Sequence, residues 1–213
     1  MQNKLKYELQ QYFIRTDEQI GQRDFIKTVR CYLRRGKSTS PTTQATKFTK
    51  IQETKILIDF IEENNCWYNN LNEDNYLAEG AEQKVYFVET ENVVIKVNTG
   101  IFYEFWEDYF DSLLLHNFFF PTTKYTFLGF LMRENNLCAV VKQDFVKSNQ
   151  DTNLEQVKQL LIANGFKNKK NNDYFHKDLG IILEDLHDEN VLSYDDILFF
   201  VDTVFYLTED FYS

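Results

Sequence analysis

The chain has 213 residues, of which 43% are hydrophobic and 16% aromatic, so it holds enough apolar material for a packed core. No segment approaches the roughly 18 uninterrupted apolar residues of a membrane-spanning helix. The first ten residues, MQNKLKYELQ, lack the apolar stretch of a secretory signal. Composition therefore predicts a cytoplasmic protein that does not enter a membrane.

Three cysteines, Cys31, Cys66 and Cys138, lie far apart and are odd in number. This pattern is typical of reduced thiols and not of a disulfide framework. The histidines, His116 among them, show no metal-ligand spacing with one another or with the cysteines. The sequence therefore predicts no structural zinc site.

The formal net charge of −10 argues against general binding of nucleic acids, but the charge is unevenly distributed. Residues 1–55 hold 12 Lys and Arg against 5 Asp and Glu, a net charge of +7, whereas the rest of the chain carries −17. This asymmetry predicts a boundary between a helical, basic N-terminal region, 1–64, and a domain over 65–213. The basic region either docks on the acidic body, which is the simpler interpretation, or contacts an anionic partner such as nucleic acid.

Apolar residues recur at three- and four-residue steps over residues 3–35 and 47–64, which predicts helices. Between them, the Gly, Ser, Thr and Pro residues of 36–46 predict a mobile connector. Residues 83–97 predict two strands joined by a short turn, and residues 103–117 a helix of about four turns.

In the second half of the chain, residues 125–146 predict a hairpin that turns on the sequence ENN. Residues 153–166 predict a helix, for which Asn164-Gly165 is a good stop. A polar loop is expected over 167–173, followed by short strands. Strands, one helix, strands, then a helix and short strands together predict an α+β fold.

Asp185 and Asn190 are five residues apart in a polar stretch, EDLHDEN, flanked by aliphatic runs. Asp202 follows another apolar run, ILFFV. One Asp beside an acceptor hydroxyl, with Asn and Asp oxygens on Mg²⁺, is what phosphoryl transfer needs. The competing interpretation is that these are turn residues, since Asp and Asn favour turns.

Lys96 lies inside the apolar strand VVIKV, where a buried ammonium needs an acidic partner or an anionic ligand. Among the acidic residues of the following helix, Glu107 is the preferred partner. Gly80 stands at a turn entering a strand, where backbone N–H groups can approach a phosphate. The alternative for Lys96 is an edge-strand lysine whose ammonium reaches solvent.

Together these motifs, in this order, resemble the protein-kinase fold. EDLHDENVL looks like the kinase catalytic loop, VIKV like the strand with the phosphate-binding lysine, and FVDT like the segment with the metal-binding aspartate. Over about residues 65–210 the chain is most similar to the predicted Ser/Thr/Tyr kinase domain of polyvalent proteins, which are large multidomain proteins of phages and conjugative elements.

The resemblance implies a kinase-like phosphotransferase that binds ATP and Mg²⁺. In it Asp185 is the catalytic base, and Asn190 and Asp202 hold the metal. Independently of the resemblance, His187 is a candidate for orienting Asp185, because a histidine in a polar loop needs a hydrogen-bond partner. Lys96, held by Glu107, binds the phosphates. The turn Gly80, Ala81, Glu82 and Gln83 covers these phosphates, and the acceptor is an unknown protein or small molecule.

The chain departs from the kinase pattern in three places. Gly80 alone remains of the glycine-rich loop, and Glu82 brings a negative charge towards the expected phosphates. Thr203-Val204 follows Asp202 in place of Phe-Gly. The chain ends soon after, whereas a full kinase needs about a hundred further residues. The expected fold is thus a kinase-like N-lobe with a truncated C-lobe, and a non-catalytic, pseudokinase-type interaction module remains the alternative.

Overall fold

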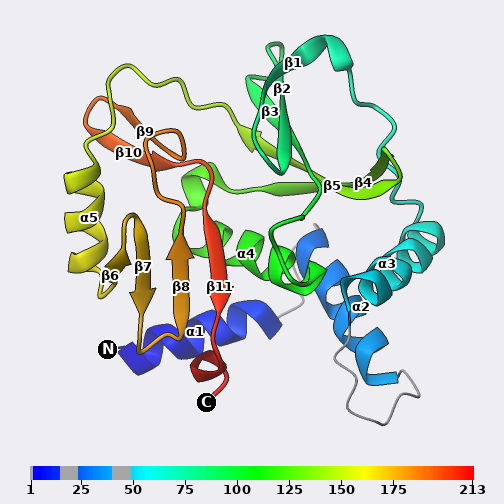
Figure 1. The fold of residues 1–213 in the computed structure, drawn as a ribbon, viewed down its shortest axis with the longest axis horizontal. Coiled ribbons are helices and arrows are strands. Elements are labelled where there is room, and N and C mark those ends of the chain that lie inside the picture. The colour runs from blue at the N-terminus through cyan, green and yellow to red at the C-terminus, as the bar shows by residue number, and fades with distance from the viewer. Residues whose placement is uncertain (1, 15–23, 40–48) are drawn as a thin grey trace. The chain divides into compact units, whose positions relative to one another are not determined.

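The computed structural model describes residues 2–14, 24–39 and 49–213 (Figure 1). The chain forms two compact units, each assembled from segments that are not contiguous in the sequence. The first unit comprises residues 1–15, 111–124 and 146–213, and the second unit comprises residues 16–110 and 125–145. The sequence predicts that the kinase-like domain begins at residue 65. The division into two units does not test this boundary, which stays a prediction.

The described residues form five α-helices, namely α1 (Gln2–Ile14), α2 (Phe25–Thr39), α3 (Lys50–Asn64), α4 (Trp106–Phe119) and α5 (Leu154–Ala163). Helix α2 continues into the predicted connector, whose residues 40–46 lie outside the described part of the chain. Helix α3 begins with a capping box between Thr49 and Gln52 and ends at Asn65, which has a left-handed backbone. In the described segments no helix is long and apolar enough to cross a membrane.

The strands are β1 (Tyr76–Glu79), β2 (Gln83–Val88), β3 (Val93–Asn98), β4 (Thr126–Arg133), β5 (Asn136–Asp144), β6 (Lys167–Lys170), β7 (Asp173–His176), β8 (Ile181–Glu184), β9 (Val191–Tyr194), β10 (Ile197–Phe200) and β11 (Val204–Leu207). Short 3₁₀ turns are η1 (Glu73–Asn75), η2 (Pro121–Thr123) and η3 (Glu209–Phe211). All pairings between these named strands are antiparallel. The fold is therefore mixed, with α-helices and antiparallel sheets, as the sequence predicts.

The second unit contains a five-stranded sheet in the order β1-β2-β3-β5-β4. Strand β3 lies between β2 and β5, and all of its residues are buried. The predicted hairpin is confirmed: β4 and β5 are joined by Glu134 and Asn135, both with positive φ, which suits a two-residue turn. Tyr86, Ile95 and Val140 belong to the apolar cluster on this sheet.

The first unit contains a four-stranded sheet in the order β11-β8-β7-β6 and the separate hairpin of β9 and β10 (Figure 1). The prediction of a polar loop over residues 167–173 is wrong in part. Residues 167–170 form strand β6, which pairs with β7. Helix α1 reaches the C-terminal residues, because Lys6 Nζ donates to Asp210 O (2.6 Å) and Gln10 Nε2 to Phe211 O (2.6 Å).

Candidate functional site

The turn that follows β8 is closed by hydrogen bonds between Asp185 and Asn190. Asn190 Nδ2 donates to Asp185 Oδ2 (3.0 Å) and to the Asp185 carbonyl oxygen (2.8 Å). Asp185 has φ = +64°, a left-handed conformation that Asp tolerates because its short side chain makes local hydrogen bonds. The Asp185 side chain is therefore exposed at the end of a buried strand and held by Asn190.

His187 lies beside the same carboxylate. The Glu189 backbone N–H donates to His187 Nδ1 (3.3 Å), and Asn190 Nδ2 contacts His187 Nε2 (3.1 Å). His187 Nε2 is 3.4 Å from Asp185 Oδ1. The structure thus places the His187 ring beside the Asp185 carboxylate, and the predicted orienting role stays a prediction.

Asp202 is brought to Asn190 by the β9–β10 hairpin. Val191 pairs with Phe200 at the base of the hairpin, so the residues just outside it come together. The Asn190 carbonyl oxygen accepts hydrogen bonds from the backbone N–H groups of Val201 (2.9 Å) and Asp202 (3.2 Å). The structure thus gathers Asp185, Asn190 and Asp202 in one place within the first unit.

A buried hydrogen-bond network fixes the chain on both sides of Asp202. His116, with no exposed surface, contacts Thr203 Oγ1 through Nδ1 (2.8 Å) and the Thr123 carbonyl oxygen through Nε2 (2.8 Å). Thr123 Oγ1 donates to the Phe200 carbonyl oxygen (2.6 Å). The sequence analysis assigned no such role to His116. Its place in the aromatic stretch HNFFFP was the available signal, because a buried histidine needs polar partners.

The oxygen atoms of this cluster suit a hard cation. Asn190 uses Nδ2 for Asp185, so its Oδ1 remains an acceptor on a residue whose backbone touches Asp202. Mg²⁺ in proteins is typically held by one or two carboxylates and keeps several waters, so a small set of oxygen donors is sufficient. Within the described residues no group of three or more His, Cys, Asp or Glu side chains is placed to bind a metal.

Lys96 is buried in the middle of β3, with 5% of its surface exposed. It stands opposite Val85 on one side and Val141 on the other. Its Nζ lies 3.4 Å from the Tyr125 hydroxyl and 5.2 Å from the centre of that ring. The predicted burial of this ammonium within the sheet is therefore observed.

Glu107 makes its ion pairs with α2. Lys37 Nζ is 2.6 Å from Glu107 Oε2, and Arg34 Nε is 3.5 Å from Glu107 Oε1. Lys37 is also 2.6 Å from Glu53 Oε1. Burial lowers the pKa of Lys37, but hydrogen bonds and attraction from Glu107 and Glu53 outweigh it and raise the pKa overall. Among the ion pairs of the described residues, none joins Glu107 to Lys96.

The turn Gly80–Gln83 joins β1 to β2 and is tied to the end of β3. The Gly80 N–H donates to the Gln83 carbonyl oxygen (2.9 Å). The Glu82 carbonyl oxygen accepts from the Thr99 N–H (3.0 Å), and Asn98 Nδ2 donates to Glu82 Oε1 (3.2 Å). The negative charge of Glu82 is therefore engaged at the end of β3.

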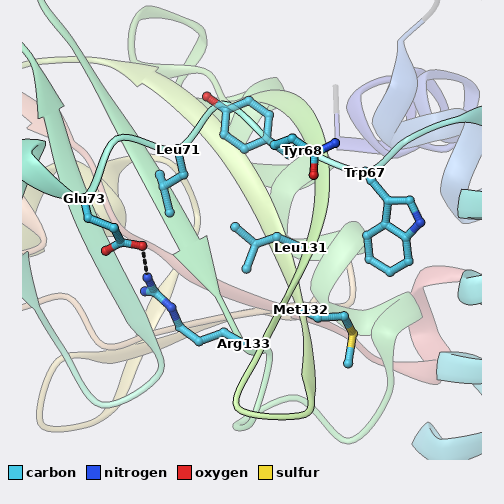
Figure 2. Close-up of a pocket in the computed structure, with 8 residues that line it drawn as sticks. Trp67, Tyr68, Leu71, Glu73, Leu131, Met132 and Arg133 are labelled. Atoms are coloured by element: carbon cyan, nitrogen blue, oxygen red, sulfur yellow. Dashed lines mark hydrogen bonds and ion pairs between the residues drawn. The ribbon is translucent and has the colours of Figure 1, made fainter.

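A pocket of about 430 Å³ lies at the outer edge of β4 (Figure 2). Its lining residues are Trp67, Tyr68, Asn69, Leu71, Glu73, Leu131, Met132 and Arg133. It arises because residues 66–68 pair with Phe130, through Tyr68 N–H to Phe130 O (2.6 Å), and then diverge from the strand. The ion pair between Glu73 and Arg133 spans it. None of the residues predicted for catalysis lines this pocket.

Comparison with known proteins identifies one family. The model of the family described as Serine/Threonine/Tyrosine Kinase found in polyvalent proteins matches residues 50–209. No curated protein and no solved structure matches the chain. The match begins with α3 and covers all the named strands, including the Asp185, Asn190 and Asp202 cluster. Because it spans well over half of the sequence, the chain belongs to the family of Ser/Thr/Tyr kinases found in polyvalent proteins.

Proposed function

We propose that the protein is a kinase-like phosphotransferase that moves the γ-phosphate of ATP to a hydroxyl acceptor with the help of Mg²⁺. The observation that carries the proposal is the cluster of Asp185, Asn190 and Asp202 in a chain of a kinase family. These residue types, together in one place, are those that phosphoryl transfer requires. The acceptor is a protein or a small hydroxylated molecule.

In this mechanism Asp185 orients the acceptor hydroxyl and accepts its proton, with His187 holding the carboxylate. Asn190 Oδ1 and the Asp202 carboxylate hold the metal. Bound Mg²⁺ would neutralise the charge that develops on the transferring phosphate. The buried network around His116 acts through the backbone of residues 200–203, because it fixes the position of Asp202.

We assign the nucleotide phosphates to Lys96 and to the turn Gly80–Gln83. A buried lysine is a preformed cation, and the backbone of Gly80 and Ala81 at the start of the turn is exposed. In terms of the kinase fold, the five-stranded sheet would be the N-lobe. The smaller sheet, with the β9–β10 hairpin, would be a truncated C-lobe.

Calorimetric titration of ATP into the full chain, with and without Mg²⁺, tests the nucleotide site. We expect micromolar binding that requires Mg²⁺ and is weakened at least about tenfold in Asp202→Asn, because one metal ligand is lost. Asp210→Asn, in the exposed η3 turn of the same unit, is the matched control and should bind as the wild type does. Absence of ATP binding by a folded sample would refute the proposal.

Asp185→Asn tests the chemical step separately. Loss of the catalytic base should lower the rate of phosphate transfer by about 10²-fold or more, while ATP binding is retained. The measurement is transfer of labelled γ-phosphate to protein and to water. Unchanged transfer in Asp185→Asn would exclude this residue as the base.

The alternative is a non-catalytic module that keeps the fold and a nucleotide site. One observation favours it, namely that Glu107 is paired with Lys37 and Arg34 of α2. A wild-type protein that binds Mg²⁺ and ATP but transfers no phosphate to any acceptor or to water would support this alternative.

A further inference from the structure

Strand β6 concentrates positive charge in an otherwise acidic part of the chain. Residues 146–213 contain 13 acidic and 6 basic side chains, and three of the six, Lys167, Lys169 and Lys170, lie on this one strand. All four residues of β6 are exposed, and none of the three lysines forms a salt bridge with a described residue. Their charges are therefore available to a ligand.

Two of these lysines, Lys167 and Lys169, border a hollow of about 370 Å³. Its lining consists of Lys167, Asn168 and Lys169 from β6, Phe175 from β7 and Ile182 from β8. Lys167 pairs with Phe175, and Phe175 with Ile182, so these side chains stand in one row across a single face of the sheet. Phe175 and Ile182 are half-buried and form an apolar floor beside the two ammonium groups. We call this hollow the β6 groove.

The β6 groove is connected to Asp185 by a short length of rigid strand. Ile182 lies on β8 and precedes Asp185, the first residue after this strand, by three residues, which is at most about 10 Å at the rise of a β-strand. The Asp185 N–H also donates to Asp173 Oδ1 (3.3 Å), at the start of β7. At the Asp185 end of this face lie the acidic residues Asp173 and Glu184. Burial raises the pKa of Glu184, and attraction from Lys169 partly opposes this effect, so the groove lysines adjoin the acidic end of the face.

We propose that the β6 groove binds an acidic segment of a protein acceptor and thereby presents a hydroxyl to Asp185. This inference rests on the proposed function and adds to it the class of substrate. An extended peptide covers about 10 Å with three residues. The preferred acceptor therefore carries Glu or Asp about three residues from its Ser, Thr or Tyr.

Two considerations favour an acidic peptide over a nucleic acid. The rest of the unit is strongly acidic and would repel a long polyanion, whereas a few carboxylates fit a local patch. The groove also has an apolar floor that suits aliphatic parts of side chains. Lysines on an edge strand can alternatively serve to prevent edge-to-edge aggregation. That role alone predicts no preference for acidic peptides.

The test measures binding without nucleotide, by fluorescence anisotropy of labelled peptides with the full chain at low salt. One peptide carries a single serine with glutamates from the third residue onward, and its partner has glutamines at the same positions. We expect the glutamate peptide to bind at least about tenfold more tightly, with an affinity that falls as salt is added.

The variant is Lys167→Glu combined with Lys169→Glu, which should remove that preference. Lys177→Glu is the matched control, because this lysine is equally exposed but follows β7 at the end of the sheet away from Asp185. It should change the affinity by less than about twofold. Equal binding of the two peptides, or equal losses in the variant and the control, would overturn the proposal. A third outcome is that the wild type shows no peptide preference and the double variant self-associates. In that case the lysines serve to prevent edge-to-edge pairing of β6 with another chain.

The outcome is distinguishable from that of the ATP titration. A glutamate preference that depends on Lys167 and Lys169, in a protein that binds no ATP, would keep the groove as a peptide site and refute phosphate transfer. ATP binding and transfer without any glutamate preference would refute the groove and leave the phosphotransferase proposal in place.

Discussion

His176, at the end of β7, is a buried histidine whose pKa is shifted by the fold. It is 3% exposed, its Nδ1 accepts from the Leu179 N–H (3.3 Å), and the Phe166 ring packs edge-on against it. Burial lowers the pKa of His176 below 6.5, and the nearby Asp178 only partly opposes this effect. The folded protein therefore keeps this ring neutral where the unfolded chain already binds a proton.

We predict that the free energy of unfolding falls as the pH drops below about 6.5, because the unfolded state takes up the proton first. Replacement His176→Gln should reduce this dependence between pH 7.5 and 5.5. Urea titrations at the two pH values measure it, and His187→Gln in the exposed turn is the control. An unchanged slope in His176→Gln would assign the dependence to other groups.

At the scale of single elements, Gly129 shows how the sequence shapes the edge of a sheet. It has φ = +139° and lies at the irregularity of β4. A Cβ atom built there would be 2.4 Å from the Cys66 carbonyl oxygen, which itself accepts from the Phe130 N–H. Glycine is thus needed both for the backbone conformation and for the close approach of residues 66–68.

Gly129→Ala should therefore lower the free energy of unfolding by about 2–4 kcal/mol, since neither the backbone nor the carbonyl can move away without breaking the pairing. Gly80→Ala is a matched glycine substitution in the same sheet, where an added Cβ meets no atom within 4 Å. It should change stability by less than about 0.5 kcal/mol. Denaturant midpoints compare the two, and similar losses would contradict this account of β4.

The junction of α2, α3 and the start of α4 depends on one buried carboxylate. Glu53 has no exposed surface, pairs with Lys37 and accepts a hydrogen bond from the Trp106 N–H. Removing this carboxylate leaves the buried Trp106 N–H without its acceptor and leaves Lys37 paired with Glu107 alone.

We predict that Glu53→Ala destabilises the protein by about 2–4 kcal/mol, from the unsatisfied Trp106 N–H and the loss of one of the two carboxylates around Lys37. Glu62→Ala, at an exposed position of the same helix, should cost less than about 1 kcal/mol. Thermal unfolding followed by circular dichroism compares them. A small effect of Glu53→Ala would indicate that Lys37 and Glu107 are sufficient for this junction.

At the scale of the whole molecule, the features predicted from sequence are those with local causes. Helix α5 stops at Asn164-Gly165, and the β4–β5 hairpin turns on Glu134 and Asn135, because each signal lies within a few residues. The proximity of Asp185 and Asn190 also follows from their spacing in one tight turn.

The features that escaped prediction depend on contacts between distant segments. The two units are built from interleaved stretches of chain, and no local pattern reports such an arrangement. Polar residues at Lys167–Lys170 indicated a loop, yet pairing with β7 made them a strand. Likewise, the choice of Lys37 as partner of Glu107 depends on how α2 packs, which spacing along α4 does not encode.

The fastening of Glu82 to Asn98 and Thr99 has a thermodynamic consequence. A turn already held in one conformation loses little conformational entropy when a ligand arrives. Binding of a ligand at Gly80–Gln83 should therefore carry a small entropic penalty. The heat-capacity change of binding should correspond to the surface that the ligand covers, and not to the larger value expected for a segment that folds on binding.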